Sequence, residues 1–80
     1  MNDSELVERI SALVEEEHRL EQAHIGDGLD QSESARMRSL EVALDQCWDL
    51  LRQRRARRAV GQDPDVATVR PADEVENYRQ

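Results

Sequence analysis

The sequence predicts an all-α fold: an antiparallel hairpin of two long helices followed by a polar tail. Apolar residues recur at spacings of three, four and seven in two long stretches, which is the pattern of amphipathic helices. A short segment containing Gly26 and Gly28 separates the stretches, and so short a connection favours antiparallel neighbours. Charged residues make up 36% of the chain, a proportion typical of helical bundles and coiled coils.

The first helix is predicted over residues 3–24. Asn2 and Glu5 have the spacing of a capping box, in which two residues satisfy each other's backbone N–H groups. Glycines accept the backbone angles that end a helix, so residues 25–30 are predicted to form a loop. The apolar residues expected in the core or at an interface are Leu6, Val7, Ile10, Leu13, Val14 and Leu20.

The second helix is predicted over residues 31–60. Asp30 and Glu33 form another capping-box pair, and Gly61 supplies a stop. Apolar positions alternate in steps of three and four, as on one side of a coiled coil, and Arg54 continues that stripe. The residues expected in the core or at an interface are Met37, Leu40, Leu44, Cys47, Trp48 and Leu51.

A polar tail is predicted over residues 61–80, where the helical periodicity is lost. Pro64 and Pro71 interrupt a continuing helix, because the residue before a proline is pushed toward extended angles. Pro71 also favours a new helix after it, so a short helix is expected over residues 72–79. Four apolar residues are expected to dock the tail in part on the hairpin: Val66, Val69, Val75 and Tyr78.

Pairing of the two helices leaves apolar surface uncovered. Folding at the predicted loop sets Leu13 near Leu44 and Val7 near Trp48, so that apolar residues meet. Half of each stripe still faces water, and an 80-residue chain with one cysteine has no internal disulfide to support a small core. Because burial of a large apolar side chain contributes ~1.5–3 kcal/mol, we expect a homodimer that forms a four-helix bundle with two-fold symmetry.

Several segments resemble a family of small actinobacterial proteins of unknown function. The most specific is the run Leu-Asp-Gln-Cys-Trp-Asp-Leu-Leu-Arg-Gln-Arg-Arg-Ala over residues 44–56. The other matching segments are Leu13-Val14, Glu16-Glu17-His18, Leu40-Glu41-Val42, Asp63-Pro64 and Arg70-Pro71. The resemblance covers nearly the whole chain and implies no activity, so it leaves the function open.

Metal binding is one alternative function. Two pairs have the Glu-x-x-His spacing of carboxylate-bridged metal sites in four-helix bundles: Glu15 with His18, and Glu21 with His24. The second pair lies nearer the apolar stripe, on which Glu17 also lies. The candidate ligands are therefore Glu17, Glu21 and His24, although Glu-rich helices often produce this spacing by chance. No cofactor is expected.

Glu17 is an anomaly because it occupies a core-type position. A buried carboxylate needs a partner, so an ion pair with Arg36 or Arg38 of the second helix is expected. A polar group in a helical core can fix register and oligomeric state at a cost in stability.

A nucleic-acid interface is the other alternative. Five arginines lie within seven residues, and arginine is the usual partner of phosphate. Against this interpretation, the net charge is −7 and no aromatic stacking platform accompanies the arginines. The residues that would contact a nucleic acid or a protein partner are Arg52, Arg54, Arg55, Arg57 and Arg58.

Enzyme activity is not expected, since the sequence has no Ser-His-Asp order, phosphate-binding glycine loop or pair of metal-binding cysteines. Cys47 is expected to be a small packing residue. No apolar run approaches the ~20 residues that span a bilayer, and one unpaired thiol fits a reducing compartment, so we expect a cytoplasmic protein. The expected function is that of a small helical interaction protein that self-associates and binds a protein partner.

Overall fold

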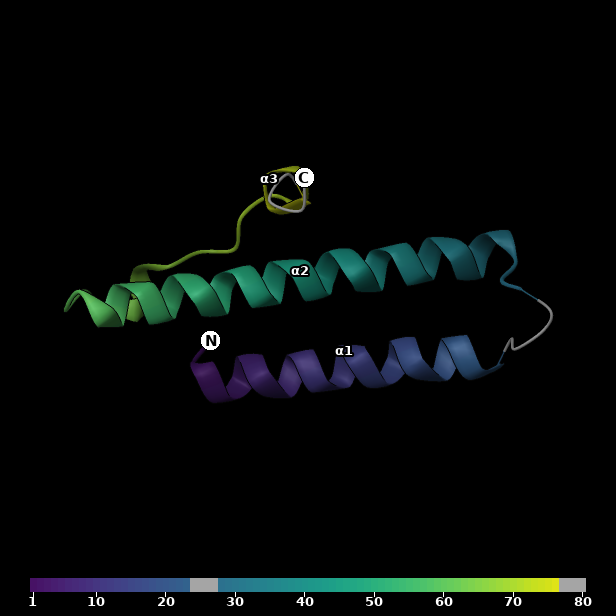
Figure 1. The fold of residues 1–80 in the computed structure, drawn as a ribbon, viewed down its shortest axis with the longest axis horizontal. Helices are drawn as coiled ribbons and strands as arrows, with labels where there is room; N and C mark the ends of the chain where they lie inside the picture. Colours follow the sequence, from purple (N-terminus) through teal and green to yellow (C-terminus); the bar gives the residue numbers. More distant parts are fainter. Residues whose placement is uncertain (24–27, 77–80) are drawn as a thin grey trace.

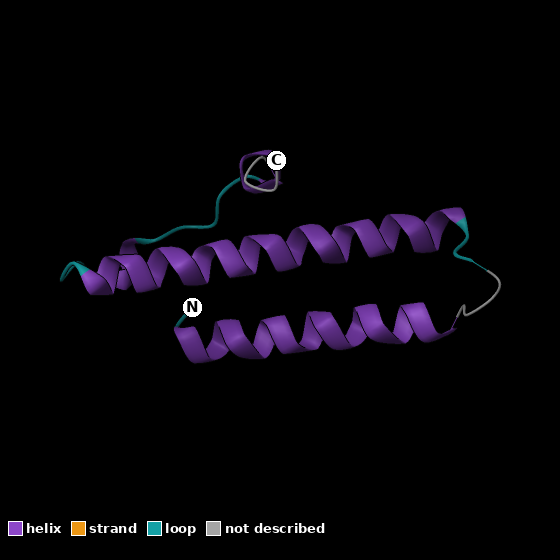
Figure 2. Ribbon diagram, in the orientation of Figure 1, coloured by secondary structure: helices purple, strands orange, loops and turns teal. Residues whose placement is uncertain are grey.

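The computed structural model describes residues 1–23 and 28–76. Its elements are α1 (Asp3–Ala23), α2 (Gln31–Ala59), the short 3-10 helix η1 (Pro64–Val66) and α3 (Ala72–Glu76). The two long helices lie side by side and run in opposite directions (Figure 1). Figure 2 shows helices joined by loops and no strand in the described ranges. The predicted all-α class is therefore confirmed.

Both predicted capping boxes are present at the helix starts. The Glu5 backbone N–H donates to Asn2 Oδ1 at 2.8 Å, and the Asn2 backbone N–H donates to Glu5 Oε1 at 3.1 Å. At the start of α2, Asp30 and Glu33 make the same two hydrogen bonds at 2.8 and 3.1 Å. These bonds satisfy N–H groups that have no partner within the helix and so define where each helix begins.

Gly61 ends α2, as predicted. Its φ of 77° lies in the left-handed region that favours glycine. The Gln62 N–H donates to the Arg57 carbonyl at 2.7 Å, and the Gly61 N–H donates to the Arg58 carbonyl at 3.1 Å. This is the Schellman arrangement, which satisfies carbonyls of the last helical turn and turns the chain back toward α2.

The core is a narrow seam between the two long helices. The core is narrow because the molecule is thin: its smallest dimension is 16 Å, and one helix with its side chains is about 10 Å across. A single layer of two helices therefore cannot enclose a core on all sides. The buried apolar residues are Leu6, Ile10 and Leu13 of α1, Leu40, Leu50 and Leu51 of α2, and Val75 of α3.

The tail returns along α2, so that η1 lies near the end of that helix and α3 near its middle (Figure 1). Two side-chain amides of α2 hold its backbone: Gln53 Nε2 donates to the Thr68 carbonyl at 2.9 Å, and Gln46 Nε2 donates to the Arg70 carbonyl at 3.2 Å. The expected partial docking is therefore observed. Val75 is buried, and Ala67 packs against the core.

The expected apolar anchors of the tail are only partly correct. Val66 and Val69 are 58% and 59% exposed, so the expectation that they anchor the tail is wrong. The reason is that segment 64–70 is held through its backbone carbonyls and charged side chains rather than through its valines. Tyr78 and the end of the predicted helix over 72–79 lie outside the described residues.

Candidate functional site

Arg54 joins three elements of the fold. It lies on the inner side of α2, and its side chain is only 7% exposed. Its Nε donates to Asp3 Oδ1 at 2.6 Å, and its Nη1 donates to Asp65 Oδ1 at 2.9 Å and to the Pro64 carbonyl at 3.3 Å. The start of α1, the end of α2 and η1 are thus tied to one guanidinium. We call these contacts, together with an Arg58–Asp3 ion pair, the Arg54 clamp.

The clamp perturbs the carboxylate at its centre. Hydrogen bonds from Arg58 and Arg54 hold the pKa of Asp3 well below its usual range. The same contacts raise the pKa of both arginines. Opposite charges that share hydrogen bonds favour each other's ionised form, so Asp3, Arg54 and Arg58 are all charged at neutral pH.

The arginine cluster is divided by these contacts. Arg54 and Arg58 are paired with acids of the same chain, and Arg57 Nη1 donates to Gln62 Oε1 at 3.4 Å. Arg52 and Arg55 are exposed and form no ion pair within residues 1–23 and 28–76. The number of arginines that could contact phosphates at once is correspondingly lower than the sequence indicates.

Asp49 makes a second polar contact with the tail. It is only 3% exposed, and its Oδ2 accepts from Gln53 Nε2 at 2.9 Å and lies 3.2 Å from Arg70 Nε. Sequence reasoning missed both this residue and the buried Leu50. The sequence feature that could have indicated Asp49 is a second stripe on α2, in which Gln46, Asp49 and Gln53 are spaced by three and four residues. What this stripe contacts becomes clear only from the path of the tail.

The opposite flank of the hairpin is open. Val7, Val14 and Trp48 are 48%, 46% and 44% exposed, although they are apolar. With Ile10, Ser11 and His18 they line an open groove of about 700 Å³, which runs along α1 beside Trp48 of α2. Large exposed apolar patches mark interaction sites in soluble proteins, and this groove brings three half-exposed apolar side chains together. We call it the open groove.

The remaining residues predicted for the core or an interface lie at the edges of the seam. Leu20, Met37, Leu44 and Cys47 are half-buried. Burial raises the pKa of the Cys47 thiol, and the nearby Arg9 opposes that shift only in part. A raised thiol pKa lowers the population of the reactive thiolate, which fits a packing role.

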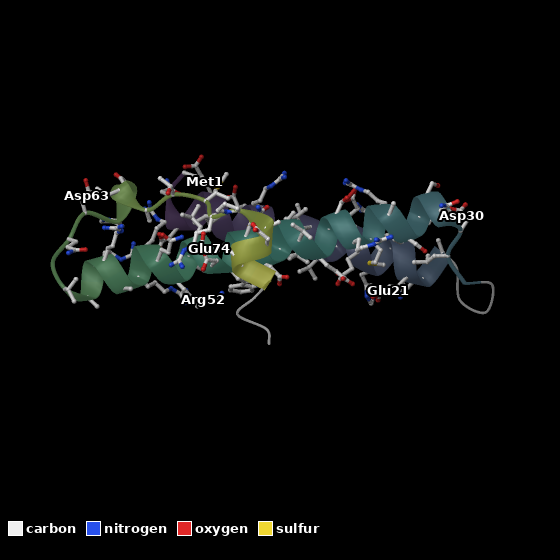
Figure 3. All side chains as sticks on the ribbon, turned by 90° about the horizontal axis from the view of Figure 1, so that it is seen from above. Met1, Glu21, Asp30, Arg52, Asp63 and Glu74 are labelled. Atoms are coloured by element: carbon white, nitrogen blue, oxygen red, sulfur yellow. The ribbon has the colours of Figure 1, made fainter. Side chains whose placement is uncertain are left out.

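The candidate metal ligands are not gathered into a site. Glu17 is half-buried, Glu21 is exposed near the turn end of the hairpin (Figure 3), and His24 lies outside the described residues. Within residues 1–23 and 28–76, no three His, Cys, Asp or Glu side chains are grouped so that they could hold a metal ion.

The expected ion pair of Glu17 is wrong. Arg36 Nη2 donates instead to both carboxylate oxygens of Glu16, at 2.7 and 2.5 Å. That hydrogen bond lowers the pKa of Glu16 and raises that of Arg36. Glu16 and Glu17 are both half-buried, and the structure pairs Arg36 with Glu16.

These observations define the class of protein: a two-helix hairpin with its own tail bound along one flank and exposed apolar side chains on the other. The chain belongs to the family described as "Protein of unknown function (DUF2630)", which matches residues 2–80. It is 52% identical over 77 residues to Rv0898c of Mycobacterium tuberculosis and to Mb0922c of Mycobacterium bovis, both called uncharacterized proteins. The match covers 95% of this chain and 88% of each relative.

The comparisons confirm the predicted resemblance to a small actinobacterial family of unknown function. No solved structure matches the chain. Within residues 1–23 and 28–76, no helix combines the length and the apolar character needed to cross a membrane.

Proposed function

We propose that this protein is a small helical interaction protein that self-associates through the open groove into a homodimeric four-helix bundle. The observation that carries the proposal is the exposure of Val7, Val14 and Trp48 on one side of the hairpin. Each is about half exposed, so covering it would contribute about 1 kcal/mol, half of the usual range for a fully buried apolar side chain. Two copies bury six such side chains.

The dimensions of the face support a second copy as the occupant. Twenty-one residues make α1 about 31 Å long, and two packed helices are about 20 Å wide. The face therefore covers about 600 Å², close to the ~800 Å² that each partner buries in a standard interface. A second hairpin presents a face of the same size and the same apolar character.

The wider setting is a proposal of the same kind. An acidic chain with one free thiol fits a reducing cytoplasm. A dimer whose tail lies on its outer side presents the exposed Arg55 and the tail to a protein partner. The nucleic-acid and metal alternatives gain no supporting observation, because Arg54 and Arg58 are paired internally and, among the described residues, Glu17 and Glu21 are not grouped with further ligands.

The test is a pair of matched valine variants. Val14→Glu places a charge in the open groove, and Val66→Glu places the same charge on a valine of η1 that is 58% exposed, against 46% for Val14. Sedimentation velocity at micromolar concentration should find Val14→Glu monomeric and both wild type and Val66→Glu dimeric, with unchanged helical circular dichroism for all three. A dimer that survives Val14→Glu would contradict the proposal.

A further inference from the structure

The open groove carries a symmetric arrangement along α1. Ser11 lies between Val7 and Val14, and Ser4 and His18 lie seven residues to either side of Ser11. Seven residues are nearly two helical turns, so these five residues share one face of the helix. A second α1 running in the opposite direction across Ser11 would place Val7 of each copy against Val14 of the other.

A matching arrangement occurs on α2. Glu41 and Arg52 are both exposed and lie eleven residues apart, which is close to three helical turns, so they share one stripe beside Trp48. Figure 3 shows Arg52 on the same side of the molecule as Glu21 of α1, with Met1 on the opposite side. Glu21 lies one turn beyond His18, so Arg52, which also borders Asp49 and Gln53, lies at the edge of the side that carries the open groove.

The two arrangements have their centres at the same level of the hairpin. Asp3 pairs with Arg54, and Leu6 belongs to one core cluster with Leu51. Residues whose numbers add to about 57 therefore lie level with each other, which sets Ser11 level with residue 46. The midpoint of Glu41 and Arg52 falls between residues 46 and 47, so one axis perpendicular to the helices relates both patterns.

From this coincidence, and resting on the dimer proposed above, we infer the geometry of the interface. The second copy of this chain binds with α1 antiparallel to α1 and α2 antiparallel to α2, around a two-fold axis beside Ser11. Glu41 of each copy then faces Arg52 of the other, and these two ion pairs flank an apolar centre made of Val7, Val14 and Trp48. Small Ser11 side chains on the axis allow the two α1 helices to approach closely.

Charge and apolar matching favour this arrangement over the other two-fold solution. If each α1 lay on the partner's α2, Val14 would be level with residue 43 and would face the acidic Glu41 across the interface. In the proposed arrangement Val7 faces Val14 and Glu41 faces Arg52, while the half-buried Asp45 comes level with Trp48 of the other copy. Electrostatic matching at an interface rim mainly selects orientation, whereas the apolar centre supplies affinity.

A charge exchange between two variants tests this geometry. In the Glu41→Arg homodimer, two arginines face each other at both rim contacts, and in the Arg52→Glu homodimer two glutamates do. The dissociation constant of each homodimer should therefore rise by about tenfold. An equimolar mixture restores both ion pairs in the heterodimer. Native mass spectrometry should then find the heterodimer well above the half expected from random mixing, and the mixture should regain wild-type affinity. The control Arg38→Glu reverses an exposed arginine that lies beside Ala35 and Val42, away from the open groove.

A second measurement examines the axis directly. In a Cys47→Ala background, Ser11→Cys should form an intersubunit disulfide under mild oxidation, whereas Ser39→Cys should not, because Ser39 lies on the other flank of α2. Random mixing of the charge variants, or a dimer without the Ser11→Cys crosslink, would overturn this geometry and leave the proposed self-association standing. A monomeric wild type would overturn both.

Discussion

The two flanks of α2 differ in what covers them, in a molecule too thin to enclose a core on all sides. On one flank, the chain's own tail covers the helix through contacts with Gln46, Asp49 and Gln53. The Arg54 clamp holds η1, at the start of the tail, against the end of the same helix. On the other flank, Trp48 and the valines of α1 have no covering segment within the described residues. Polar contacts thus hold a segment of the same chain on one flank, and apolar side chains stay exposed on the other. The comparison separates residues that stabilise the hairpin from residues that we expect to bind a partner.

Removal of the clamp should produce the largest change. Arg54→Ala leaves Asp3, Asp65 and the Pro64 carbonyl without their shared donor, and loss of one partner of a buried pair is strongly destabilising. We expect Tm to fall by about 10 °C.

Arg54→Lys keeps the charge but cannot bind both acids with a fork of donors, so its Tm should lie between those of wild type and Arg54→Ala. Thermal unfolding followed by circular dichroism measures both variants at one protein concentration, because a dimer's Tm depends on concentration. An Arg54→Ala protein as stable as wild type would show that the clamp is not structural.

Loosening the tail should have an intermediate effect. Asp49→Asn keeps the shape of the side chain but removes the ion pair with Arg70, which should lower the free energy of unfolding by about 1–2 kcal/mol. Hydrogen exchange should quicken over residues 64–76 and stay unchanged at the start of α1. Equal acceleration in both regions would contradict the separation of the two flanks.

The smallest effect should come from pH. The pKa of Asp3 is lowered in the folded chain by Arg58 and Arg54, so its contribution to stability is complete above the ordinary aspartate pKa and is lost as the pH falls below it. Glu16, whose pKa is lowered by Arg36, acts in the same direction. Exposure to solvent screens both contributions.

Urea midpoints at pH 7 and pH 3 should therefore differ more for wild type than for Asp3→Asn, which lacks the titrating group. An Asp3→Asn protein with the same loss of stability between the two pH values would show that this carboxylate is not part of the response.

Much of the hairpin could be predicted because its signals are local. Capping pairs, Gly61 and the spacing of apolar residues each act within a few residues, so the ends of the helices follow from the sequence. The sequence also places Arg54 on the inner stripe, but not its partners, since Asp3 and Asp65 are 51 and 11 residues away. Asp49 and Leu50 were missed for the same reason, because the path of the tail decides which flank of α2 is covered.

The error at Glu17 has a different origin. Adjacent residues of a helix point about 100° apart, so Arg36 selects Glu16 over Glu17 through a difference that spacing alone does not resolve. The sequence did predict that pairing leaves half of each apolar stripe open, and Val7 and Val14 are 48% and 46% exposed. Periodicity does not say what covers them.

The central claim is that the open groove is covered by a second copy of the chain. Sedimentation equilibrium of the untagged protein over a hundredfold range of concentration tests it most directly. We predict a single reversible monomer–dimer equilibrium with the dimer dominant at micromolar concentration. A monomer at every concentration would contradict the claim and leave Val7, Val14 and Trp48 to a partner other than this chain.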